Sequence, residues 1–121
     1  MSVWSALMGD GTFGLEVVGV ASCQPELEEI CQGDPQERIV LAVLILDDTN
    51  PSDPRTVRVQ IWQRTVGYLR PADATAFRAW LGRDAREVRR FRCRAKLQRT
   101  ILPLGGEGWW TVHLDICLPQ A

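Results

Sequence analysis

The chain has 121 residues, a length typical of a single domain with one modest core. Its composition is that of an ordinary globular protein, with 45% hydrophobic and 24% charged residues. The longest apolar run, residues 39–46, is far shorter than the roughly 20 residues of a membrane-spanning helix. The N-terminus lacks the basic leader and apolar stretch of a secretory signal, so we expect a cytoplasmic protein without a membrane partner.

The net charge of −1 conceals an uneven distribution along the chain. Residues 1–54 carry one basic and ten acidic side chains, a net charge of −9, whereas residues 55–121 carry thirteen basic and five acidic ones, a net charge of +8. Thirteen of the fourteen basic residues are arginine, whose planar guanidinium pairs with phosphate through two parallel hydrogen bonds. The asymmetry favours a polyanionic partner, but mutual neutralisation of the two halves within the fold explains it equally well.

The predicted elements, taken in chain order, are short strands interrupted by two helices. Alternating apolar residues and runs of β-branched residues indicate the strands. A proline at the first helical position and a glycine after the end mark each helix. The predicted elements are a strand at Phe13–Val20, a helix at Pro25–Gln32, strands at Arg38–Leu46, Thr56–Trp62 and Thr65–Leu69, a helix at Pro71–Leu81, and strands at Arg90–Leu97 and Trp110–Leu118.

This order of elements predicts a β-rich α+β fold, a small six-stranded OB- or SH3-like barrel with two short helices. We expect one domain at residues 13–121, preceded by an N-terminal extension at residues 1–12. Residues on the inward faces should form the core: Val17, Val40, Ala42, Leu44, Val57, Val59, Ile61, Phe77, Leu81, Phe91, Cys93, Val112, Leu114 and Ile116.

The strand at residues 90–97 has the most regular alternation in the chain. Its apolar residues face one way, and Arg90, Arg92, Arg94 and Lys96, which we call the basic stripe, face the other. Side chains on one face of a strand lie about 7 Å apart, close to the phosphate spacing of a single-stranded nucleic acid. The basic stripe is therefore a candidate phosphate-binding surface. Alternatively, it is a solvated face or pairs with the acidic helix residues 26–29.

Arg58, Trp62 and Tyr68 are further candidates for nucleic-acid binding. Arg58 and Trp62 point outward from the strand at residues 56–62, and Tyr68 lies in the next strand. Aromatic rings beside basic groups form the usual stacking platform for single strands. The alternative is that the tryptophans, five in so small a domain, belong to the core or cover the sheet.

Residue types that catalyse reactions or bind metals are not arranged for either task. The four cysteines include no C-x-x-C pair, so we interpret them as structural thiols. The acidic loop with Asp47, Asp48, Asn50 and Asp53 misses the EF-hand spacing and is better explained by turn chemistry. His113 is the only histidine, and no serine or cysteine is placed as its nucleophile. We expect no enzymatic activity, no cofactor and no metal.

Several segments, in their order and spacing, resemble the HIRAN domain family. They are a V-V-G strand within residues 17–20, an N-P-x-D loop at residues 50–54 followed by a V-x-V strand, and a V-G-x-L strand at residues 66–69. The resemblance covers residues 15–81 and extends in pattern to residue 118. It implies a small β-barrel that occurs alone or fused to Swi/Snf-type helicases and captures the 3′ end of single-stranded DNA.

By position, the resemblance assigns Asn50, Asp53 and Tyr68 to the DNA-binding pocket. The chain departs from the DNA-binding member of this family directly after the V-V-G strand, where Ala-Ser-Cys at residues 21–23 replaces basic and aromatic residues. This change removes a phosphate partner and two stacking rings from the pocket. We therefore expect strand binding through the basic stripe, and recognition of a 3′ hydroxyl stays an open alternative.

Two functions of different classes follow from these patterns. The first is a non-enzymatic module that binds nucleic acid, DNA above all, in single-stranded or end-containing form. The second is a protein-interaction module that docks or targets a separate helicase or nuclease. A continuous positive surface would favour the first function, and an exposed apolar patch would favour the second.

Overall fold

The computed structural model describes residues 4–6, 9–32, 37–47, 56–81, 90–101 and 107–116. Every strand and helix predicted from the sequence is present, with ends shifted by a few residues. The elements are β1 (Trp4–Ala6), β2 (Leu15–Val18), the 3-10 turn η1 (Val20–Cys23), α1 (Gln24–Ile30), β3 (Glu37–Asp47), β4 (Thr56–Ile61), β5 (Arg64–Leu69), α2 (Pro71–Leu81), β6 (Arg90–Ile101) and β7 (Glu107–Leu114).

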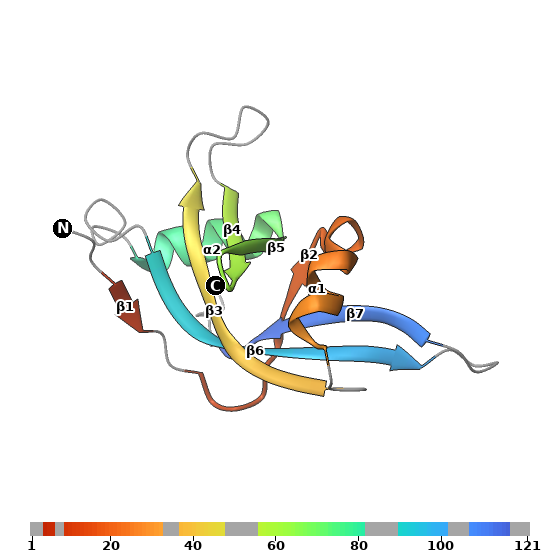
Figure 1. Cartoon of the computed structure of the whole chain (residues 1–121). Coiled ribbons are helices and arrows are strands. Elements are labelled where there is room, and N and C mark those ends of the chain that lie inside the picture. Colours follow the sequence, from red (N-terminus) through yellow and green to blue (C-terminus); the bar gives the residue numbers. More distant parts are fainter. Residues whose placement is uncertain are drawn as a thin grey trace.

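The strands form a closed antiparallel barrel. Six of them follow one another in the order β6, β3, β4, β5, β2, β7, and β7 pairs again with β6. Closure depends on the short β2, which pairs with β7 through Leu15 and Glu16 and with β5 through Val17 and Val18. Figure 1 shows the long, curved β3 and β6, with α1 over β7 and α2 behind β3 and β4. The predicted six-stranded barrel with two short helices is confirmed.

β6 is paired along both of its edges. One edge pairs with β3 through residues 90–98, and the other pairs with β7 through residues 95–101. At residues 90–92, which β7 does not reach, the second edge is covered by β1, which runs parallel to β6. The sequence did not predict β1, which lies within the expected N-terminal extension. Because both edges are occupied, the inward and outward faces of β6 are fixed.

The expected core residues are found inside the barrel. All of them are buried except Val40, which is half-buried and packs against the core. Phe77 of α2 packs edge-on against Phe91 of β6, with ring centroids 5.3 Å apart and ring planes at 85°, a favourable aromatic geometry. Trp110 is also in the core and is only 1% exposed. Neither described helix is long and apolar enough to cross a membrane.

Gly67 of the V-G-x-L segment is required by a close approach between β5 and β2. A Cβ atom at this position would lie 2.5 Å from both Val17 Cγ1 and the carbonyl oxygen of Val18. Real Cβ atoms do not approach carbonyl oxygens so closely, and the backbone of β2 cannot withdraw without breaking its pairing with β5. The glycine therefore allows β2 to close the barrel, independently of any ligand.

We predict that Gly67→Ala destabilises the protein by about 1–3 kcal/mol, the usual cost of overpacking. Gly14→Ala is the matched control, because a Cβ there would meet only Thr12 Oγ1 at an ordinary 3.7 Å. The control should change the free energy of unfolding by less than about 0.5 kcal/mol. Urea titration of the three proteins measures both values. Equal stability of the two variants would contradict the close approach.

Candidate nucleic-acid interface

The basic stripe lies on the outer face of β6, as the alternation predicted. Arg90, Arg92 and Arg94 are exposed and Lys96 is half-buried, while the intervening residues are buried. The β3–β6 register places an aliphatic residue of β3 beside each cation. The pairs are Arg90 with Ile45, Arg92 with Val43, Arg94 with Leu41, and Lys96 with Ile39.

The barrel register extends this face to Arg58 and Tyr68. Ile45 pairs with Arg90 on one side and with Arg58 on the other, and Arg58 pairs with Tyr68. Arg90, Arg58 and Tyr68 therefore occupy a single row that crosses β6, β3, β4 and β5. Arg58 and Tyr68 are half-buried, and the Nε of Arg58 is buried with no hydrogen-bond partner among the described residues. A buried donor without a partner costs free energy, so an acceptor that reached the Arg58 Nε would stabilise it.

The four cations of the basic stripe are not equivalent. Arg94 Nη2 lies 2.7 Å from Oδ2 of Asp115, which is only 2% exposed, and Asp115 Oδ1 accepts the Gly11 amide at 2.8 Å. Lys96 Nζ lies 3.9 Å from Glu37 Oε1 and 4.9 Å from the Phe13 ring centroid. Arg94 and Lys96 thus help to hold the N-terminal segment, although the Arg94 side chain remains 57% exposed.

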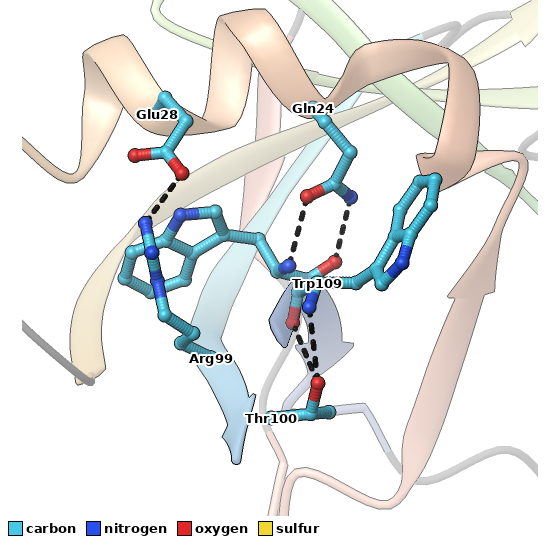
Figure 2. A network of polar contacts seen from close by, with 6 residues as sticks. Gln24, Glu28, Arg99, Thr100 and Trp109 are labelled. Atoms are coloured by element: carbon cyan, nitrogen blue, oxygen red, sulfur yellow. Dashed lines mark hydrogen bonds and ion pairs between the residues drawn. The ribbon is translucent and has the colours of Figure 1, made fainter. Parts of the chain in front are cut away.

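The acidic helix α1 pairs with arginines outside the basic stripe. Glu28 pairs with Arg99, as Figure 2 shows, and Glu29 pairs with Arg64. The expected alternative partnership between α1 and the basic stripe is not among the described ion pairs. Four of those pairs nevertheless join the acidic half of the chain to the basic half: Glu16–Arg70, Glu28–Arg99, Glu29–Arg64 and Glu37–Lys96. Part of the charge asymmetry is therefore neutralised within the fold.

A polar network below α1 was not predicted from the sequence. The Gln24 side chain accepts the amide of Trp110 at 2.9 Å and donates to its carbonyl oxygen at 2.9 Å (Figure 2). Gln24 thereby replaces a neighbouring strand along β7 beyond the point where β2 pairs with it. Thr100 bonds the Trp109 backbone in the same way on the opposite edge of β7. The network is structural and lies apart from the basic stripe.

The aromatic candidates do not form one platform. Tyr68 lies in the row with Arg58, whereas Trp62 lies in the β4–β5 turn, four residues further along the chain than Arg58. Trp62 is 55% exposed, and the Arg38 guanidinium lies over its ring at 5.1 Å. Trp80 and Trp109 are exposed as well, so among these four tryptophans only Trp110 lies in the core.

The predicted loop candidates Asn50 and Asp53 lie outside the described residues. The segment at residues 21–23 belongs to η1, which contacts β5 next to Tyr68. A Cβ atom on Gly19 would lie 3.4 Å from Tyr68 Cδ2, so the end of the V-V-G strand and Tyr68 are neighbours. The described segments that carry the family resemblance are therefore brought together around Tyr68.

The described cysteines are Cys23, Cys31 and Cys93, and all three are free thiols. Burial and, secondarily, the Asp115 carboxylate raise the pKa of Cys93 to about 12. Burial and Glu26 also raise the pKa of Cys23. A raised pKa opposes the thiolate form that metals and reactive sites need. Within the described ranges, no three His, Cys, Asp or Glu side chains come together as a metal-binding group.

Comparisons with known proteins give no relative for this chain. No protein-family model matches it, and neither a curated protein nor a solved structure does.

We predict that Arg94→Gln destabilises the protein by about 1–2 kcal/mol, because it leaves the buried Asp115 carboxylate without its cation. The cost stays below the roughly 3–5 kcal/mol of a wholly buried pair because Arg94 is more than half exposed. Arg64→Gln, which removes only an exposed pair with Glu29, should change stability by less than about 1 kcal/mol. Chemical unfolding compares the two, and Asp115→Asn should restore part of the stability that Arg94→Gln removes. Equal effects of both arginine variants would contradict a structural role for Arg94.

The raised pKa of Cys93 predicts a loss of stability in alkali. The unfolded thiol has a pKa of about 8.5, whereas the folded thiol keeps its proton until about pH 12. Stability from this residue is complete below the unfolded pKa and is lost as pH rises toward the folded pKa. By about pH 10, the parent protein should lose about 2 kcal/mol more than Cys93→Ala. Parallel pH profiles of the two proteins would show that Cys93 ionises freely in the folded state.

Proposed function

We propose that this protein is a non-enzymatic module that binds single-stranded nucleic acid on its outer face, across β6, β3, β4 and β5. One observation carries the proposal: the row from Arg90 through Ile45 and Arg58 to Tyr68 joins cations to an aromatic ring on one surface. Phosphates on arginines and bases on an aromatic ring are the two contacts that sequence-independent single-strand binding requires.

Arg90 and Arg92 are the principal phosphate contacts in this proposal. Both are exposed and stand two residues apart on β6, so their side chains lie about 7 Å apart. Arg94 extends the line with the exposed part of its guanidinium, while Lys96 contributes least because it is half-buried between Glu37 and Phe13. A strand lying along β6 would turn its bases toward β4 and β5, where Arg58 and Tyr68 lie.

The resemblance to HIRAN domains supports the same ligand. Tyr68 and the end of the V-V-G strand are neighbours, as a shared pocket requires. The η1 segment beside Tyr68 offers no basic or aromatic side chain, with Ala21 and Ser22 exposed and Cys23 half-buried. The protein therefore binds along the strand and does not select a 3′ hydroxyl.

We predict that the double variant Arg90→Gln/Arg92→Gln weakens binding to oligonucleotides of all sequences about equally, because phosphate contacts carry no base information. The slope of log affinity against log salt should fall by about 0.7 for each arginine–phosphate interaction that the substitutions remove. Tyr68→Ala should weaken binding by about 1–3 kcal/mol and leave the salt slope unchanged. Fluorescence anisotropy over a range of salt concentrations measures both effects.

The matched control is Arg64→Gln/Arg70→Gln, which makes the same change in net charge at arginines paired with Glu29 and Glu16. This control should keep nearly all of the affinity and salt slope of the parent. If the two double variants weaken binding alike, attraction depends on bulk charge and the proposed surface is wrong. Absence of binding by the parent protein at low salt would refute the function itself.

A further inference from the structure

We propose that Leu41 and Ile39 of β3 form an apolar strip on which the bases of a bound strand pack, so that the surface selects nucleic acid with unpaired bases. This role rests on the proposed function and supplies base contacts beside the phosphate-binding arginines. Leu41 and Ile39 are 61% and 50% exposed, whereas their chain neighbours Val40 and Ala42 pack toward the core. Strand residues two apart share a face, so the two exposed side chains lie about 7 Å apart on the outside of the barrel.

The apolar strip runs directly beside the basic stripe. The β3–β6 register pairs Leu41 with Arg94 and Ile39 with Lys96, and opposed side chains on paired strands lie about 5 Å apart. A nucleotide carries its base on the sugar next to its phosphate. The base attached to a phosphate on Arg92 or Arg94 is therefore within reach of β3 on one side and of β7 on the other.

The segment that precedes β2 covers the β7 side of the basic stripe. The Gly11 amide donates a hydrogen bond at 2.8 Å to Asp115, which directly follows β7. The Phe13 ring of the same segment has Arg94 Cζ 5.5 Å and Lys96 Nζ 4.9 Å from its centroid. The apolar strip on the β3 side is accessible by contrast, so bases attached to phosphates at this part of β6 pack on β3.

Aliphatic side chains recognise the faces of bases. They offer no hydrogen-bond donor or acceptor, so they cannot pair with the edges that a duplex presents in its grooves. Each base of a duplex is stacked between its neighbours, whereas an unpaired base can turn a face toward the protein. The apolar strip therefore favours single strands over duplexes.

The size of the apolar strip disfavours a protein partner. A stable protein interface buries about 800 Å² on each side around an apolar core, whereas the strip consists of two side chains bordered by cations of β6. The other large apolar side chains exposed among the described residues lie in the β4–β5 turn, in α2 and in β7: Trp62, Trp80 and Trp109. A base, which buries one flat face, matches a pair of aliphatic side chains.

The test compares two ligands that differ only in their bases, an oligothymidylate and an abasic strand with the same number of phosphates. The parent protein should bind the oligothymidylate more tightly. Leu41→Thr/Ile39→Thr, which keeps residues that favour strands, should weaken this binding about tenfold because apolar burial is lost. Its affinity for the abasic strand and its salt slope should not change, since no charge is altered. Trp80→Gln, which removes an exposed apolar side chain from α2, should bind both ligands as the parent does.

The abasic strand also reports folding, because its affinity depends on an intact basic stripe. Equal losses toward both ligands, or no loss toward either, would overturn the role of the apolar strip. Binding of a duplex by the parent as tightly as a single strand would overturn it too, as would a dimer in light scattering that the double variant abolishes. If the parent binds both ligands alike through Arg90 and Arg92, the proposed function stands and the apolar strip alone is wrong. Absence of all binding by the parent would refute the proposed function itself.

Discussion

The pairing of β6 along both edges is the constraint on which the rest of the structure depends. A strand with two neighbours cannot slip by one residue, because such a slip would exchange its buried and exposed faces against both of them. β3 holds one edge, while β1 and β7 share the other. The alternation of arginine with Phe91, Cys93 and Ala95 is therefore converted into an apolar interior and a basic exterior. β6 also closes the barrel, because it is the first strand in the barrel order and pairs with β7, the last.

The uneven charge of the chain is distributed over two kinds of site. Acids of β2, β3 and α1 pair with arginines and a lysine of the second half, which joins the two halves at the surface. Exposed pairs of this kind contribute little to stability individually. Arg94 differs because its partner Asp115 is buried, and their contact fixes the segment around Gly11 against the end of β7. The four cations of the basic stripe, which look alike in the sequence, therefore differ in role, because Arg94 also holds a buried carboxylate.

The sequence predicted the strands and helices because hydrophobic alternation is local information. It also predicted that Arg58 and the basic stripe point outward, which the structure confirms. Trp62, predicted as the last residue of a strand, is exposed but lies in the β4–β5 turn. β1 was missed because three residues, Trp4–Ala6, are too few to show a period. The partners of Arg94, Gln24 and Trp110 could not be predicted, because they depend on which strands become neighbours. The positive φ of Trp62 also leaves no sequence signal, since neither Trp nor Gln is typical of this turn.

The central claim is that nucleic acid lies on the outer face of β6, β3, β4 and β5. Titration of the isotope-labelled protein with a short oligothymidylate, followed by NMR spectroscopy at low salt, tests it most directly. The account predicts that the largest amide shifts occur at Arg90, Arg92, Ile45, Arg58 and Tyr68, with little change in α1 and around Trp109. Shifts concentrated on α1 and around Trp109, or no shifts at all, would contradict it.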